Sequence, residues 1–260
     1  MNSINKDEAG DLSNIILNIN ARTRAHDGLV LREGPSVDTK QLDLIPYGTN
    51  LRVISLCNGF KYGSGDPMVL TEYNGKRGYV HSRYILIDNN IDISSYSLEQ
   101  KYAFGVLYYN QAQTITFDFW HNGGIADCTP TQEYEQVSNG NYEKLLPQGV
   151  TIAQVTSDFY KYFSTDYSYN DANDKIDFNH YYIEKDGYLW RVSGFGDDPS
   201  WDYDEVIEMT SNTTDKLRFK VIHHYAPQFY DHYGCEYKEY LLSLRLENGL
   251  WKIDAPFTIQ

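Results

Sequence analysis

Short runs of apolar residues, each ended by turn residues, fill most of the first third of the chain. Leu29 to Leu31 leads into a Gly-Pro turn, and the runs at 50–56 and 68–73 are each followed by an Asn-Gly pair. An Asn-Gly pair between two such runs is typical of a tight type I′ hairpin. The pattern predicts a small all-β barrel.

A helical pattern follows further along the chain. Thr151 and Gln154 form a capping box, and the apolar residues after it recur at helical spacing, which predicts a helix over 152–164. Thr129-Pro130 resembles a second helix start, with Pro at the first helical position. It predicts a short helix that ends near residues 139–140.

After residue 178 the pattern again favours strands. The expected strand pairs are 180–184 with 188–193, 205–210 with 216–225, and 237–246 with 250–253. Helices followed by an antiparallel meander predict an α+β domain whose helices cover one sheet face. The predicted organisation is an N-terminal arm (1–21), a barrel (22–88), a polar linker (89–100) and an α+β domain (101–260).

Charge is distributed very unevenly. Residues 1–90 hold ten Lys+Arg and ten Asp+Glu, whereas residues 91–260 hold twelve and twenty-six, which accounts for the net charge of −14. Such an acidic block repels phosphate backbones, so we expect no nucleic-acid partner. A basic protein surface is the expected partner, because complementary charge speeds encounter.

The barrel segment resembles the bacterial SH3 (SH3b) family. The resemblance rests on Leu29-x-Leu31-Arg32-x-Gly34-Pro35-Ser36, Tyr47-Gly48-Thr49-x-Leu51-x-Val53, and Tyr73-Asn74-Gly75-Lys76-x-Gly78-Tyr79-Val80-x-x-x-Tyr84-Ile85. It departs from the family at Tyr79, where Trp is common, and in the longer hairpin at 60–67. The resemblance implies binding to peptidoglycan or a wall peptide. The candidate contacts are aromatic: Tyr47, Tyr62, Tyr79, His81 and Tyr84. Tyr79 and Tyr84 also suit the barrel core.

The second half resembles cystatin-like or NTF2-like domains, and more narrowly the DL-endopeptidase inhibitor family of Gram-positive cell walls. The resemblance rests on the aromatic helix at 155–164, the Glu-Lys-Asp-Gly-Tyr-Leu-Trp hairpin at 184–190, and the ending at 249–254. It implies that this half binds and blocks a cell-wall D,L-endopeptidase. The implied location is secreted or attached to the cell envelope, although no signal peptide is visible near Met1.

One acidic segment with aromatic residues is the predicted protein-binding loop. Its candidate contacts are Phe195, Asp197, Asp198, Trp201, Asp202, Tyr203 and Asp204. A tryptophan can serve as a buried anchor while the carboxylates approach a basic rim. Trp201 packed into the sheet core is the structural alternative.

Two other functions compete with binding and inhibition. Asp127-Cys128 resembles the start of the Asp-Cys-Ser-Gly motif of NlpC/P60-like peptidoglycan hydrolases, with His180 as the expected base. Thr129-Pro130 replaces Ser-Gly, and the following residues are polar, so we expect the protein not to be an enzyme. The other alternative is a cystatin-like cup that binds a small molecule, lined by some of the 19 tyrosines after residue 90.

Metal and cofactor motifs are missing from the sequence. The acidic run at 171–177 begins like an EF-hand loop but has Ile where that loop needs Gly. His223 and His224 adjoin in an expected strand, so they point to opposite faces. The three cysteines suit packed thiols, with a Cys128–Cys235 disulfide as the alternative. No apolar run approaches about 18 residues, so we expect no membrane span.

Overall fold

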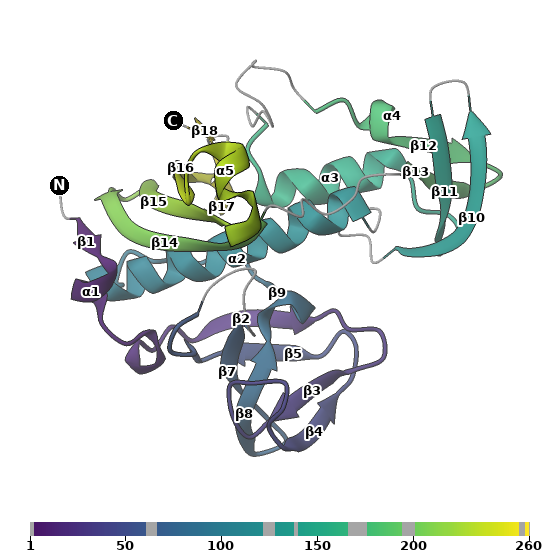
Figure 1. The fold of residues 1–260 in the computed structure, drawn as a ribbon. Helices are drawn as coiled ribbons and strands as arrows, with labels where there is room; N and C mark the ends of the chain where they lie inside the picture. Colours follow the sequence, from purple (N-terminus) through teal and green to yellow (C-terminus); the bar gives the residue numbers. More distant parts are fainter. Residues whose placement is uncertain are drawn as a thin grey trace.

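One long helix, α2 (Leu98–His121), runs through the centre of the protein, with β-sheets on two sides of it (Figure 1). The computed structural model describes residues 3–60, 67–121, 128–137, 140–165, 176–193, 201–254 and 258–259. This part of the chain is mostly β, arranged in antiparallel sheets with few helices.

The N-terminal third folds into two sheets. One has the order β5-β2-β9 and the other β4-β3-β8-β7-β6. Their strands are β2 (Ile19–Thr23), β3 (Leu29–Arg32), β4 (Gln41–Ile45), β5 (Asn50–Val53), β6 (Ser55–Leu56), β7 (Met68–Tyr73), β8 (Lys76–His81) and β9 (Ile85–Ile87). The chain passes between the sheets at Ile54, whose N–H donates to the carbonyl of Leu70 at 2.8 Å, and again through the 3-10 helix η2 (Ser82–Tyr84).

Local turn chemistry explains the pairing of β7 with β8. Asn74 and Gly75 have φ angles of 50° and 72°, as a type I′ hairpin requires. Gly78 allows β8 to approach β3 closely, because a Cβ there would lie 2.5 Å from the carbonyl oxygen of Arg32. The predicted hairpin is therefore confirmed, and Gly78 of the SH3-like motif has a steric role.

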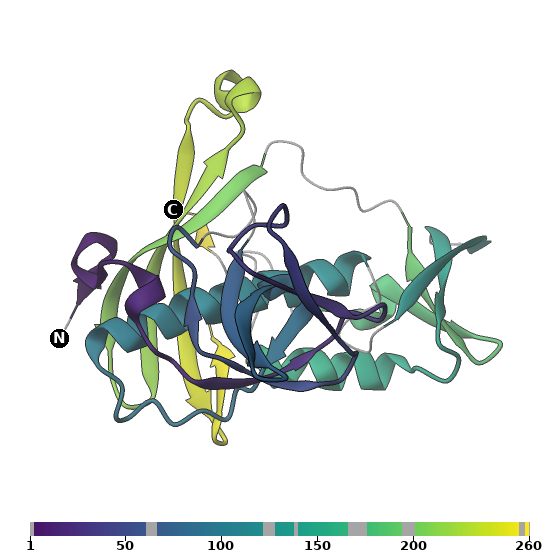
Figure 2. The same cartoon turned by 90° about the horizontal axis from the view of Figure 1, so that it is seen from below.

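A larger sheet closes the other side of α2. Its order is β1-β14-β15-β16-β17, with β18 also paired to β16. Its strands are β1 (Ile4–Asn5), β14 (Trp201–Asn212), β15 (Lys216–Tyr225), β16 (Tyr237–Glu247), β17 (Leu250–Ile253) and β18 (Thr258–Ile259). Between β15 and β16 lie η3 (Pro227–Phe229) and α5 (Tyr230–Tyr233), at the end of a hairpin that projects from the body (Figure 2).

The first residues of the chain belong to this C-terminal sheet. Ile4 is buried and pairs with Met209 of β14, and Lys6 of helix α1 (Lys6–Ala9) forms an ion pair with Glu205 at 2.6 Å. The 3-10 helix η1 (Leu12–Asn14) follows, and β2 begins at Ile19 rather than after the predicted arm. Residues 3–21 are thus integrated into both sheet systems.

A four-stranded sheet, with the order β10-β11-β13-β12, lies beside the end of α3 (Figure 1). Its strands are β10 (Thr129–Val137), β11 (Gly140–Leu146), β12 (Tyr182–Lys185) and β13 (Tyr188–Val192). The prediction of a helix after Thr129 is wrong, because this segment forms strand β10. The Thr131 hydroxyl donates to the carbonyl of Lys144 across the strand pair, and Lys144 forms an ion pair with Glu133 at 3.0 Å. Alternating polar residues without a helical apolar stripe favour this cross-strand pairing.

The predicted helix after Thr151 is confirmed as α3 (Ile152–Tyr162). The Thr151 hydroxyl accepts a hydrogen bond from the N–H of Gln154 at 3.1 Å. A short helix, α4 (Phe178–Tyr181), precedes β12, so His180 lies on a helix instead of the expected strand. Its cap is Asp177, whose side chain accepts from the N–H of Asn179 at 3.0 Å.

Helix α2 contacts both sheet systems, and the sequence pattern did not predict it. Gly105 lets it lie against the Phe219 ring of β15, because a Cβ there would be 2.1 Å from that ring. On its other side, Asn110 accepts a hydrogen bond from the Ser82 hydroxyl at 2.7 Å, and Gln111 accepts one from the N–H of Ile87 at 3.0 Å. Two independently folding domains stay a prediction, since this helix packs against both parts.

Candidate functional site

Three loops meet at the end of β2 in the N-terminal sheets. The N–H of Arg24 donates to the carbonyl of Tyr84 at 2.9 Å, and the N–H of Gly48 donates to the carbonyl of Thr23 at 3.1 Å. The first bond joins the β2–β3 loop to η2, and the second joins β2 to the β4–β5 loop. Side chains that are far apart in sequence are thereby brought to one end of these sheets.

Two ring pairs lie on these loops. His26 stacks on Tyr47 with ring centroids 4.7 Å apart and an interplanar angle of 10°. His81 meets Tyr84 edge to face at 5.5 Å and also caps η2, since its Nδ1 accepts the N–H of Arg83 at 3.2 Å. Tyr47 and Tyr84 remain 39% and 43% exposed, so both pairs present aromatic surface to solvent.

The predicted wall contacts lie in different surroundings. Tyr47, His81 and Tyr84 are brought to the loops around the end of β2, and Tyr84 is not in the core. Tyr79 is partly buried and packs against the core, opposite Leu70 in the β7–β8 register. Tyr62 lies outside the described residues. His26 was not among the predicted contacts, because only the pairing of β2 with its neighbours brings it onto Tyr47.

The predicted protein-binding loop is only partly described. Phe195, Asp197 and Asp198 lie outside the described residues, and Trp201 is the first residue of β14, paired with Tyr225. The end of the predicted loop is thus a strand.

Within that strand the neighbouring side chains differ in exposure. Asp202 is exposed, whereas the half-buried Tyr203 stacks on His224 with centroids 4.1 Å apart. Asp204 is buried, so its carboxylate does not face a partner protein as predicted.

The Asp204 carboxylate is the centre of a buried polar network. Its Oδ1 lies 2.8 Å from Nδ1 of His223, and its Oδ2 accepts hydrogen bonds from the Tyr109 hydroxyl at 2.7 Å and from Gln113 Nε2 at 3.2 Å. Tyr225 and Tyr240 meet the His223 ring edge to face. The network joins α2 to β14 and β15, and no short sequence motif marks it.

The two residues of the alternative hydrolase site lie at different elements. Cys128 is buried directly before β10, so the helix N-terminus on which activation of its thiol depended is a strand. His180 is exposed on α4, with its ring against Tyr181 at 5.0 Å. Cys128 and Cys235 form no disulfide with each other in the described part of the chain.

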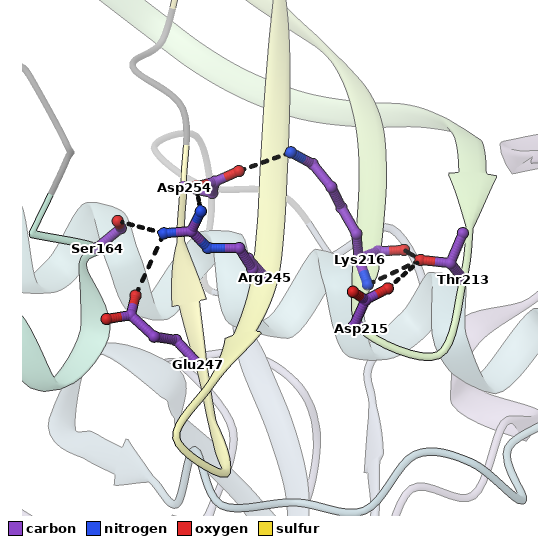
Figure 3. A network of polar contacts seen from close by, with 7 residues as sticks. All are labelled: Ser164, Thr213, Asp215, Lys216, Arg245, Glu247 and Asp254. Carbon is purple, nitrogen blue, oxygen red and sulfur yellow. Dashed lines mark hydrogen bonds and ion pairs between the residues drawn. The ribbon is translucent and has the colours of Figure 1, made fainter.

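The side chains of a charged network on the C-terminal sheet pair with one another (Figure 3). Arg245 donates to the Ser164 hydroxyl at 3.0 Å and pairs with Asp254 at 3.2 Å and Glu247 at 3.4 Å. Lys216 pairs with the same Asp254 at 2.6 Å. Since each carboxylate already faces a cation, this network stabilises the end of α3 against β16 and β17.

Three tyrosine hydroxyls in the interior are protected from ionisation. Burial is the main cause that raises the pKa of Tyr102, of Tyr108 and of Tyr162. Their hydroxyls donate to the carbonyls of Val206, Trp251 and Ile87 respectively. These groups are fixed donors in the core and do not serve as acids near neutral pH.

Clusters of metal-ligating side chains and long apolar helices were sought in the described ranges. No group of three or more His, Cys, Asp or Glu side chains among them is placed to hold a metal ion. His223 and His224 have separate partners, as the strand alternation predicts. None of the helices in the part of the chain that the structure describes is both long and apolar enough to span a bilayer.

Comparison with known proteins does not assign a family. No protein-family model matches the chain, and no curated protein is significantly similar to it. Function is therefore inferred from the residues and their geometry.

Proposed function

We propose that this is a non-enzymatic cell-envelope binding protein whose N-terminal sheets form an SH3-like barrel that docks on peptidoglycan or a wall peptide. The observation that carries the proposal is the display of two ring pairs, His26 with Tyr47 and His81 with Tyr84, on loops that meet at the end of β2. The SH3-like order of the sequence motifs supports the same ligand class.

The geometry of the pairs suits such a ligand. Aromatic faces bury apolar area against peptide and sugar groups, and a tyrosine loses few rotamers on binding. The stacking partner of Tyr47 and the edge contact of Tyr84 already restrict both rings before the ligand arrives. Restriction in the free protein lowers the entropy lost on association.

The second part of the proposal concerns the acidic residues 91–260, taken as a cystatin-like domain that binds a basic protein such as a cell-wall D,L-endopeptidase. Their charge excess of fourteen, from twenty-six acidic against twelve basic residues, supports a basic partner. The proposed contacts are Phe195, Asp197, Asp198, Trp201, Asp202 and Tyr203. Asp204 is omitted, because its carboxylate binds His223 and Tyr109 inside the protein.

Cosedimentation with purified peptidoglycan tests the barrel assignment. A Tyr47→Ala/Tyr84→Ala double variant should lose most of the bound fraction. The matched control is Tyr134→Ala/Tyr237→Ala, which removes two exposed tyrosines, 56% and 48% accessible, from β10 and β16. Equal cosedimentation of the two double variants would show that the ring pairs do not bind the wall.

The inhibitor assignment needs a separate assay. Wall hydrolysis by a panel of D,L-endopeptidases is measured with and without the protein. Slower hydrolysis by at least one basic endopeptidase is expected, with the affinity falling as salt rises. Release of wall fragments by this protein alone, abolished in Cys128→Ala with the fold retained, would establish the hydrolase alternative.

A further inference from the structure

A pocket of about 370 Å³ lies on the outer face of the β5-β2-β9 sheet and is bordered by α3. Its lining residues are Asn20, Ala21, Arg22, Asn50, Leu51, Leu86, Ile87, Asp88 and Tyr162. None of them belongs to the two ring pairs. The volume lies at the low end of small-molecule sites, about 300–1,000 Å³, so the pocket suits one or two amino-acid residues.

Strand register places the polar side chains of the pocket on one surface. Arg22 lies opposite Asn50 of β5 and opposite Leu86 of β9. Asn20 adjoins Asp88, whose N–H donates to the Asn20 carbonyl at 2.9 Å. Side chains two apart on a strand share a face, so a cation, an anion and two amides point into the same space.

The two charged side chains of this surface, Arg22 and Asp88, are not paired with other side chains in the described ranges. Arg22 and Asp88 make no side-chain hydrogen bond or ion pair with any residue in the described ranges. By contrast, the neighbouring sheet pairs Lys76 with Asp43 at 3.0 Å. Asp88 directly follows β9 and lies diagonally across from Arg22 of β2. Such diagonal positions are typically about 7–8 Å apart, so a bipolar ligand can lie between the two side chains.

Tyr162 lines the pocket from α3, and the charges of Asp88 and Arg22 both act on it. Its side chain is buried, and its hydroxyl donates to the Ile87 carbonyl at 3.3 Å. Burial is the main cause that raises the Tyr162 pKa; the Asp88 charge raises it further, while the Arg24 and Arg22 charges oppose the rise. The Tyr162 ring therefore lines the pocket close enough to Asp88 and Arg22 for both charges to influence its pKa.

We propose that this pocket binds a short zwitterionic peptide or free amino acid, with its carboxylate on Arg22 and its ammonium on Asp88. A guanidinium binds a carboxylate in a bidentate fork, and charge-assisted hydrogen bonds are the strong ones. The Asn20 and Asn50 amides meet the peptide group, and Leu86 contacts a small apolar side chain. A phosphate is disfavoured by Asp88, and a simple cation by Arg22.

Calorimetric titration of the intact protein with dialanine, N-acetyl-dialanine and dialanine amide tests each contact separately. Dialanine should bind saturably. Capping its amino end with an acetyl group, or its carboxyl end as an amide, should weaken binding about tenfold, because each cap removes one charge-assisted contact. In Arg22→Gln, dialanine and its amide should bind equally. In Asp88→Asn, dialanine and its N-acetyl form should bind equally.

Arg52→Gln is the matched control, because Arg52 lies on the same face opposite Asn20 but does not line the pocket. It should keep the full response to both caps, and thermal unfolding confirms that all three variants are folded. Absence of saturable dialanine binding, or identical responses of Arg22→Gln and Arg52→Gln, would overturn the proposal. Cosedimentation with peptidoglycan depends on Tyr47 and Tyr84 instead, so failure of one proposal leaves the other standing.

Discussion

Asp204 Oδ1 lies 2.8 Å from His223 Nδ1, and the two residues are directly opposite each other on β14 and β15. The same buried carboxylate accepts the Tyr109 hydroxyl from α2. One side chain thus joins the central helix to the sheet beneath it. A buried charge is tolerated only when its hydrogen-bonding capacity is satisfied, which makes this contact sensitive to substitution.

Asp204→Asn should lower the free energy of unfolding by about 2–4 kcal/mol, because one partner of a buried network is replaced by a group that cannot accept every bond. Asp202→Asn, two residues earlier and exposed, is the matched control and should change stability by less than about 0.5 kcal/mol. Urea unfolding measures both variants. Equal stability of the two would show that the Asp204 network contributes nothing.

The close approach of α2 to β15 gives a second prediction. Gly105→Ala places a methyl group within 2.1 Å of the fully buried Phe219 ring, so overpacking should cost about 1–3 kcal/mol. Phe219→Leu in the same chain should recover part of that loss, since it frees space at the contact. A double-mutant cycle with additive losses would contradict a direct contact between the two positions.

Alkaline pH should unfold the protein through its buried phenols. Burial raises the pKa of Tyr102, Tyr108 and Tyr162 above the ordinary 10.0, so the unfolded state releases these protons first. The free energy of unfolding should therefore keep this contribution below about pH 10 and lose it as the pH rises further. Absorbance at alkaline pH, followed together with circular dichroism, should show a fraction of phenols that ionise only on unfolding.

Tyr162→Phe supplies the check on that result. Removing one buried phenol should weaken the dependence of stability on alkaline pH, even if the variant is less stable overall. Ionisation of every tyrosine while the near-ultraviolet dichroism stays native would contradict the prediction.

The elements that the sequence predicted correctly are those fixed by neighbouring residues. Asn74-Gly75, Asp186-Gly187 and Asn248-Gly249 all have positive φ angles, and each joins two antiparallel strands as expected. The Thr151 cap is equally local. Turn and cap chemistry depends on side chains within a few positions, so a short window contains the necessary information.

The missed and mistaken elements depend on distant contacts. Helix α2 is buried continuously from Tyr102 to Ala112, so it lacks the one-sided apolar stripe by which a surface helix is found. The Thr129-Pro130 capping pattern does not start a helix, because Thr131 and Glu133 both bond to Lys144 of β11 and the segment forms a strand. The Asp204 network and the Arg22 pocket likewise combine residues that only the sheet register brings together.

The acidic half should increase the rate at which a basic endopeptidase associates with this protein. Asp202 is exposed at the start of β14, so its charge remains available at the surface. Asp202→Asn should slow association a few-fold at low salt while dissociation changes little, because long-range charge acts mainly before contact. The difference should shrink as the salt concentration rises and screens exposed charges.

Glu72→Gln is the matched control, because it removes one exposed carboxylate from β7, outside the acidic half. Its association rate should stay close to that of the unmodified protein. Surface plasmon resonance at two salt concentrations measures both rates. Equal slowing by the two substitutions would indicate that net charge alone governs the encounter, and an unchanged rate in Asp202→Asn would remove this residue from the partner-binding surface.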